Sequence, residues 1–153
     1  MNKEQIIQYY LKSHNVKKLT DFLNDASNNH ISCHGLIGSS RAYIVAATAE
    51  TTGGHSFVIC SDKEKAAYFY NDLENIYGEK DTDYSKKRIL FYPTSYKRPY
   101  EPEKPDNTYI LSRTEVLQRI SSSERKTIIV TYPEALSEKV ITRKVMTKNT
   151  YKI

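Results

Sequence analysis

The chain has 153 residues, of which 39% are hydrophobic and 27% are charged, and this composition predicts one globular domain rather than a disordered or fibrous protein. No run approaches the roughly 18 apolar residues that a membrane-spanning helix needs, and the polar start Met1-Asn2-Lys3-Glu4-Gln5 lacks the layout of a secretory signal. We therefore expect a cytoplasmic protein with no membrane partner.

The net charge of +5 raises the question of nucleic-acid binding. Residues 139–153 carry 5 of the 23 basic residues and no acidic residue, so the other 18 basic residues balance all 18 acidic ones. A DNA-binding module usually gathers its positive charge on one face of its folded body. This distribution argues against a small stand-alone nucleic-acid-binding protein and predicts a basic extended tail over residues 139–153.

Residues 1–30 are expected to form an N-terminal helical appendage of two short helices. The break between them is predicted at Ser13-His14-Asn15, where Asn15 could cap the second helix. Apolar residues recur at helical spacing on both sides of this break: Ile6, Ile7, Tyr10 and Leu11, then Val16, Leu19, Phe22 and Leu23.

Strands and helices are expected to alternate over residues 31–138. The predicted strands cover residues 31–37, 57–60, 88–92 and 128–130, and helices cover 40–52, 63–77, about 107–121 and a short segment from Pro133. Short, uniformly apolar strands separated by helices are typical of a parallel sheet covered on both faces. The predicted fold class is therefore α/β, with a doubly wound, mostly parallel sheet.

Helix ends and helix faces are also predicted. Asp62 is expected to cap the helix over 63–77, and Gly78 is expected to end it. Its inward face should carry Ala66, Phe69, Tyr70, Leu73 and Ile76. In the helix over 107–121, the residues expected to point inward are Ile110, Val116, Leu117 and Ile120.

The two cysteines, Cys33 and Cys60, lie in apolar runs that are predicted to be strands, so both are expected to be buried, reduced thiols. A zinc site would need two more ligands at close spacing, and His30, His34 and His55 form no recognisable ligand pair with them. We predict neither a metal site nor a catalytic triad.

The segment Gly35-Leu36-Ile37-Gly38-Ser39-Ser40-Arg41-Ala42 lies where the first predicted strand meets a predicted helix. Nucleotide-binding loops of the type GxxxxGKT or GxxxxGKS occupy this junction, because backbone amides and the helix N-terminus hold phosphate there. Gly35 takes the first glycine position, but Ser40, Arg41 and Ala42 replace the second glycine, the lysine and the hydroxyl residue. The sequence predicts a degenerate phosphate loop.

These replacements change the chemistry of the loop. Ser40 adds a side chain where the backbone must approach phosphates, Arg41 replaces a compact ammonium with a planar fork, and Ala42 lacks the oxygen that binds magnesium. ATP hydrolysis and a catalytic residue are therefore not expected. Two readings stay open: a residual anion site at the amides of Ser39 to Arg41, or a loop that only packs.

Three segments, GLIGSSRAYIVAATAE, LFYPTSYKRPYEPEKPDNTYILSR and VTYPEALSEKV, together resemble the UvrB-homology region at the N-terminus of the transcription-repair coupling factor (Mfd) family. In that family a strand ending in proline leads to an aromatic residue and a Pro-Tyr pair, here Tyr96 and Pro99-Tyr100. A Ser-Arg pair, here Ser112-Arg113, then opens the next helix. The resemblance covers residues 31 to about 145 and leaves residues 1–30 uncovered.

The resemblance implies an ATP-dependent DNA translocase that displaces stalled RNA polymerase and recruits UvrA in nucleotide excision repair. Its UvrB-like part is implied to keep the P-loop-NTPase-like fold of helicase domain 1a type without the ATPase motifs. UvrA contacts would belong chiefly to an inserted second domain, into which residues 139–153 would lead. ATP and magnesium would bind to separate motor domains of the parent protein, leaving no cofactor in residues 1–153.

The expected function of the chain itself is a non-catalytic scaffold and interaction module. The alternative is an active nucleotide-binding, helicase-like domain. A possible interaction loop is formed by Tyr96, Lys97, Arg98, Tyr100 and Arg113. Aromatic and basic residues of this kind can stack on single-stranded DNA, but the same loop could simply pack over the edge of the sheet.

Overall fold

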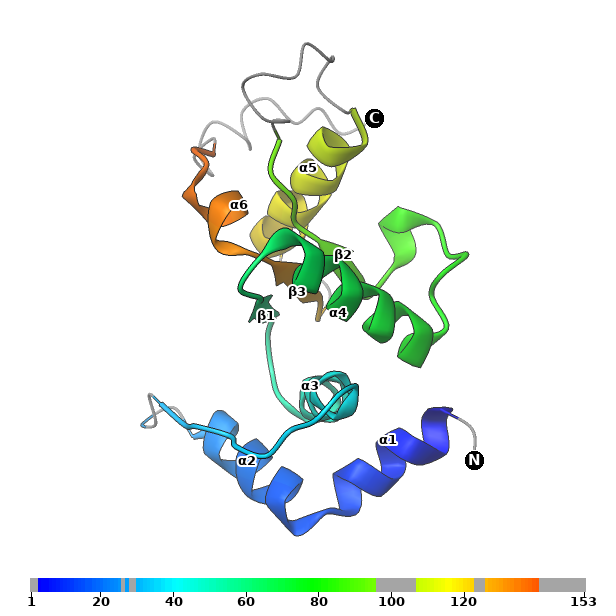
Figure 1. Cartoon of the computed structure of the whole chain (residues 1–153), viewed down its shortest axis with the longest axis vertical. Helices are drawn as coiled ribbons and strands as arrows, with labels where there is room; N and C mark the ends of the chain where they lie inside the picture. The colour runs from blue at the N-terminus through cyan, green and yellow to red at the C-terminus, as the bar shows by residue number, and fades with distance from the viewer. Residues whose placement is uncertain (1–2, 26, 28–29, 96–106, 123–125, 141–153) are drawn as a thin grey trace.

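The computed structural model describes residues 3–25, 27, 30–95, 107–122 and 126–140, and these form a mixed α/β protein (Figure 1). The described residues contain six α-helices, one short 3-10 helix and one parallel sheet of three strands. In chain order the elements are α1 (Lys3–Lys12), α2 (His14–Asn24), α3 (Ser40–Thr51), β1 (Ser56–Ile59), α4 (Lys63–Tyr77), η1 (Tyr84–Lys86), β2 (Ile89–Phe91), α5 (Asn107–Ser122), β3 (Ile128–Thr131) and α6 (Pro133–Ser137).

The sheet has the strand order β1-β3-β2, with both pairs parallel. Ile129 of β3 lies opposite Phe57 of β1 on one side and opposite Leu90 of β2 on the other. All four residues of β3 are buried, as expected for a strand with neighbours on both sides and helices on both faces. The last strand in the sequence is therefore the central strand of the sheet.

Helices α4 and α5 cover opposite faces of the sheet. The Phe91 ring lies 5.5 Å from the Tyr70 ring of α4, whereas the Arg113 guanidinium of α5 lies 4.2 Å from the ring of the next residue, Tyr92. Successive side chains of an extended chain point to opposite sides of a sheet. The expectation of a parallel sheet is confirmed for these three strands, and helices cover both faces at β2.

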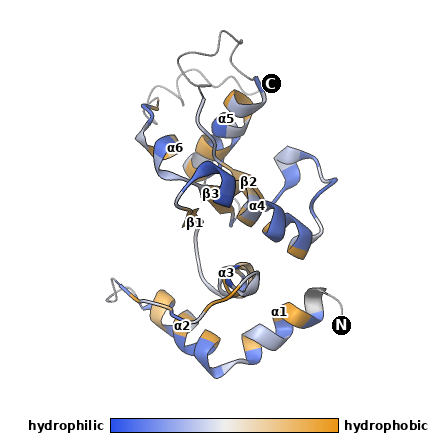
Figure 2. Ribbon diagram, viewed as in Figure 1, coloured by the Kyte–Doolittle hydropathy of each residue, from blue (hydrophilic) through white to orange (hydrophobic). Residues whose placement is uncertain are grey.

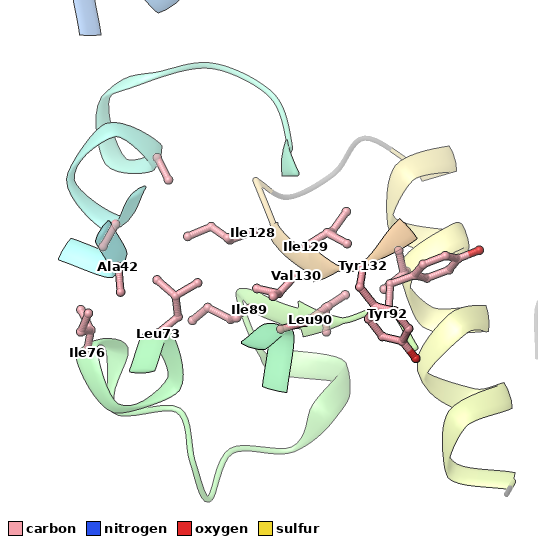
Figure 3. Close-up of a cluster of buried hydrophobic side chains, with 14 of the residues drawn as sticks. Ala42, Leu73, Ile76, Ile89, Leu90, Tyr92, Ile128, Ile129, Val130 and Tyr132 are labelled. Carbon is pink, nitrogen blue, oxygen red and sulfur yellow. The ribbon is translucent and has the colours of Figure 1, made fainter. Parts of the chain in front are cut away.

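The hydrophobic core lies between α3, α4, the sheet and α5 (Figure 3). Leu73 of α4 and Ile129 of β3 are completely buried, and Val116 of α5 is 1% exposed. Small side chains on one face of α3, including Ala42 and Ala46, allow this helix to approach α4 closely. The described core is continuous from α3 through the sheet to α5 and α6.

Helices α1 and α2 pack against α3 rather than against the sheet (Figure 1). Tyr10 of α1 and Tyr43 of α3 stack with ring centroids 5.6 Å apart, and Val16 of α2 is 4% exposed. Both helices carry alternating hydrophilic and hydrophobic segments, as Figure 2 shows. Their apolar faces therefore cover the side of α3 that faces away from the sheet.

The C-terminal half of α3 is tied to α4 and the sheet by polar contacts. Three residues outside α3 contact its last two turns or its C-terminal cap: Tyr77 at the end of α4, Arg88 before β2 and Lys126 before β3. The contacts are Tyr77 Oη to Ala46 O at 3.2 Å, Arg88 Nη2 to Glu50 Oε1 at 2.9 Å, and Lys126 Nζ to Thr52 O at 2.7 Å. This end of α3 is thus fixed to α4 and to the segments that flank β2 and β3.

Most predicted elements are confirmed. The helix predicted over 63–77 has these bounds, with the Asp62 carboxylate accepting a hydrogen bond from the Lys65 amide and Gly78 in the left-handed conformation. Helices α3, α5 and α6 and strands β1, β2 and β3 lie within one or two residues of the predicted positions. None of the helices in the described residues combines the length and apolar character that a bilayer crossing requires.

Four local predictions are wrong. Residues 31–37 form no strand, since they pair with none of the strands in the described residues and Gly35 has a φ of 76°. Cys33 is consequently exposed, and Cys60, one residue beyond β1, is only half-buried. Ser13 rather than Asn15 occupies the cap position of α2, and it makes no side-chain cap hydrogen bond. Ile110 is 42% exposed because it lies in the first turn of α5, beyond the edge of the core.

The predicted divisions at residues 30 and 138 remain predictions. The C-terminal part of the predicted basic tail, residues 141–153, lies outside the described residues.

Replacing Leu73 with alanine is expected to lower the free energy of unfolding by about 2–5 kcal/mol, because a fully buried leucine loses its contacts and leaves a cavity. The matched control is Leu111→Ala on α5, where the side chain is 68% exposed and the expected loss is below about 0.5 kcal/mol. Urea denaturation of the two variants measures both values. Equal losses would contradict the described packing of α4.

Candidate functional site

The predicted phosphate loop is a tight, exposed turn before α3. Gly35 and Gly38 both have positive φ values, 76° and 55°. The Ser40 amide and the Ser40 hydroxyl both donate to the Ile37 carbonyl, at 3.3 and 2.7 Å. Ser39, at the cap position, makes no side-chain cap hydrogen bond. The turn is therefore held by Ser40, the residue that replaces the second glycine of a phosphate loop.

Arg41 and Ala42 point in different directions. Arg41 is exposed, and its Nε donates to the Leu36 carbonyl at 3.4 Å, so the guanidinium folds back over its own loop. Ala42 is 1% exposed and belongs to the hydrophobic core. The side chain at the position of the magnesium-binding hydroxyl therefore faces the protein interior instead of the loop.

The strand that should lead into a phosphate loop is missing from the described structure. A nucleotide-binding loop depends on a strand to aim its backbone amides at the phosphates. Here residues 31–37 are exposed coil except for half-buried Leu36. The predicted loop residues are adjacent, but their geometry differs from that of a strand-loop-helix phosphate site.

A hollow of about 1100 Å³ lies between this loop, α2, α3, α4 and the C-terminal end of β1. Its walls are mixed, with apolar residues from α2 and α3 and the polar residues Arg41, Lys65 and Asp72. Lys65 is already paired, since its Nζ lies 3.0 Å from the Asp62 carboxylate. Burial, with a smaller contribution from Asp62, raises the pKa of the Cys60 thiol on this wall.

Arg113, predicted as part of an interaction loop, is instead buried in the protein. Its Nη1 donates to the carbonyls of Pro93 and Ala135, at 2.7 and 3.1 Å, and lies 3.3 Å from the Glu138 carboxylate. The guanidinium also lies over the Tyr92 ring at 4.2 Å. Burial raises the pKa of the Tyr92 phenol, while Arg113 opposes this rise.

The same network fixes the segment that follows β2. The Glu138 carboxylate accepts hydrogen bonds from the amide and the hydroxyl of Ser95, at 3.0 and 2.7 Å. The Thr94 amide donates to the Tyr132 hydroxyl at 3.0 Å. Residues 93–95 are therefore joined to α5, to the residue after β3 and to α6 at the carboxyl ends of the strands, where α/β sheets commonly bind ligands.

Four residues of the predicted interaction loop, Tyr96, Lys97, Arg98 and Tyr100, lie outside the described residues. Only the two ends of this loop are described, at Ser95 and Asn107. The prediction that the loop contacts DNA or a partner remains a prediction.

The sequence reading missed the buried charged residues. Arg113 and Arg119 are 6% and 8% exposed, and Lys87 forms a buried ion pair with Glu74. Helical spacing was a usable signal, because Arg113 and Arg119 lie three residues before and after buried Val116. A pattern restricted to apolar residues could not detect them.

No group of three or more His, Cys, Asp or Glu side chains in the described part of the chain is arranged to hold a metal ion. Comparison with known proteins gives no match, whether with family models, with curated proteins or with solved structures.

Arg113→Ala is expected to lower the free energy of unfolding by about 3 kcal/mol, because the carbonyls of Pro93 and Ala135 lose a buried donor and Glu138 loses its ion-pair partner. The control is Arg88→Ala, which breaks the more exposed pair with Glu50 and should cost at most about 1 kcal/mol. Chemical denaturation measures both losses. A loss for Arg113→Ala no larger than that of the control would contradict the structural role of this network.

Proposed function

We propose that the chain is the first α/β module of the UvrB-homology region of a transcription-repair coupling factor, and that this module is a non-catalytic scaffold. The starting point is the resemblance of residues 35–50, 90–113 and 130–140 to that family. The proposed fold is the doubly wound, P-loop-like helicase domain of 1a type. Three parallel strands with helices on both faces support this proposal at the level of architecture.

Two of the three segments that resemble the coupling-factor family meet in one polar network. This contact supports treating them as parts of the same structural unit. Pro93 and Arg113 belong to the segment over 90–113, and Ala135 and Glu138 belong to the segment over 130–140. Arg113 contacts all three of the other residues. One buried side chain thus joins two segments that lie far apart in the sequence.

One observation carries the non-catalytic part of the proposal: Ala42 is buried in the core while Arg41 folds over its own loop. A functional phosphate loop places a lysine on the β- and γ-phosphates and a hydroxyl on magnesium. Neither group is present at these positions in the sequence. The alternative of an active nucleotide-binding domain would require both functions from other residues, and no described feature favours it.

The wider activity belongs to the proposed parent protein. There the module would support the rest of the same polypeptide. UvrA would bind mainly to the following domain. RNA polymerase, DNA, ATP and magnesium would bind to other domains. The basic residues from Lys139 onward would lead into that second domain. The cytoplasm is the proposed location.

ATP with magnesium is expected to leave the melting temperature of the chain unchanged, because the lysine and the metal-binding hydroxyl are absent. A ligand at 100 times its dissociation constant would stabilise the folded state by roughly 2.7 kcal/mol, which thermal unfolding detects easily. Sulfate at the same ionic strength is the control for a non-specific anion effect. A rise with ATP that sulfate does not reproduce would reverse the non-catalytic assignment.

The coding sequence beyond Ile153 tests the family assignment separately. We expect a second UvrB-like domain, followed later by motor domains that contain an intact phosphate loop with lysine and a hydroxyl residue. A continuation without such motor domains would refute the assignment to a coupling factor while leaving the result with ATP unaffected.

A further inference from the structure

Several donors converge on the carboxylate of Glu138. The Ser95 amide lies 3.0 Å from each of its two oxygens, and the Ser95 hydroxyl donates to Oε2 at 2.7 Å. Arg113 Nη1 lies 3.3 Å from the same Oε2. A backbone amide, a hydroxyl and a guanidinium all form charge-assisted hydrogen bonds with carboxylates. The cluster therefore has the donors of a carboxylate-binding site.

Other contacts hold these donors in place. Arg113 Nη1 also donates to the Pro93 carbonyl at 2.7 Å. One residue before Ser95, the Thr94 amide donates to the Tyr132 hydroxyl at 3.0 Å. None of these contacts involves the carboxylate, so the order of the donors does not depend on it alone. A site with ordered donors loses little conformational entropy when a ligand binds.

The Glu138 side chain is more exposed than the arginine with which it pairs. It is 18% exposed, compared with 8% for the Arg113 side chain. Glu138 follows the five-residue helix α6 and has an extended backbone, with φ −71° and ψ 137°. A rotation of the chain after this short helix can therefore withdraw the carboxylate while α5 stays packed on the sheet.

An apolar hollow of about 210 Å³ lies beside Glu138. Three of the residues that line it, Phe57, Leu136 and Val140, are 49%, 44% and 48% exposed. Among the described residues that line it, only Glu138 is charged. A molecule that entered the hollow from solvent would thus meet apolar walls next to the donors of the carboxylate cluster.

We propose that Ser95 and Arg113 form a binding site for a carboxylate with a short apolar body, and that the chain fills this site with its own Glu138. A ligand replaces Glu138 by accepting the hydrogen bonds of Ser95 and pairing with Arg113, while its hydrocarbon part lies in the hollow. Glu138 is a built-in competitor, because a ligand binds only when it withdraws. The site is independent of the family to which the chain belongs.

Carboxylate binding to the Glu138→Ala variant of the full chain, followed by NMR of the Ser95 amide, tests the proposal. The substitution removes the competitor and keeps the donors. Propionate, titrated against chloride at constant ionic strength, should shift the Ser95 amide resonance until it saturates. At ten times its dissociation constant it should raise the melting temperature by about 3–6 °C.

The length of the ligand tests the role of the hollow. Acetate, propionate and butyrate differ by one methylene each, and burial of each methylene should tighten binding by about fourfold. Sulfate has no hydrocarbon part and should bind about tenfold more weakly than butyrate, or weaker still. Equal affinities for sulfate and butyrate would show a general anion site and would overturn the proposed class of ligand.

Ser95→Ala in the Glu138→Ala background removes the donated hydroxyl. Propionate should then bind about tenfold more weakly, because a hydrogen bond to a charged group is lost. The matched control is Glu50→Ala, which removes the partner of Arg88 in a more exposed ion pair. In this control propionate should give neither a saturable shift of the Ser95 amide nor a rise in melting temperature.

The wild type and a second variant test the role of Glu138. In the wild type the dissociation constant should be about tenfold larger or more, because the tethered carboxylate competes at a high effective concentration. Glu138→Gln keeps the shape but loses the charge, and it should give an intermediate value. If Glu138→Ala does not fold alone, propionate should restore its folding.

Three results would overturn the proposal. The first is the absence of both a saturable shift and a propionate-dependent gain in folding in the two Glu138 variants. The second is a wild-type affinity equal to that of Glu138→Ala, which would exclude Glu138 as a competitor. The third is undiminished binding after Ser95→Ala, which would place the ligand elsewhere.

Discussion

Strand β3 is the element on which the rest of the described structure depends. It is the only described strand with a neighbour on each side, and it is completed by residues 128–131, close to the end of the described chain. Strands β1 and β2 make no pairing with each other, so neither can join the sheet until β3 is in place. Folding of the sheet therefore requires contacts between residues that lie about 40 and 70 positions apart in the sequence.

A second constraint is the group of charged side chains in the interior. Arg113 and Arg119 on α5 donate to backbone carbonyls around β2 and α6, so the helix is fixed to the sheet by hydrogen bonds as well as by apolar packing. A buried guanidinium is costly unless its donors are satisfied. Their satisfaction by carbonyls at the strand ends makes the position of α5 specific, and it orients the chain that enters and leaves residues 96–106.

The loop before α3 carries the non-catalytic part of the proposed function. The turn is stabilised by Ser40, the neighbouring arginine lies over the loop, and the next side chain is part of the core. These features suit a loop that packs better than one that holds nucleotide. The hollow beside it is lined in part by Cys33, His34 and Leu36, which lie outside the sheet in the described arrangement.

Local sequence patterns determined most elements of this protein. Asp62 and Gly78 set the ends of α4, and apolar runs located β1, β2 and β3, because capping and burial of short strands depend on neighbouring residues. The altered residues Arg41 and Ala42 likewise indicated a degenerate loop from their chemistry alone. Only the tertiary structure decided the strand order, the burial of Arg113 and the unpaired state of residues 31–37. A strand forms only when another strand satisfies its backbone, and a charged side chain is buried only where distant carbonyls and carboxylates accept its hydrogen bonds.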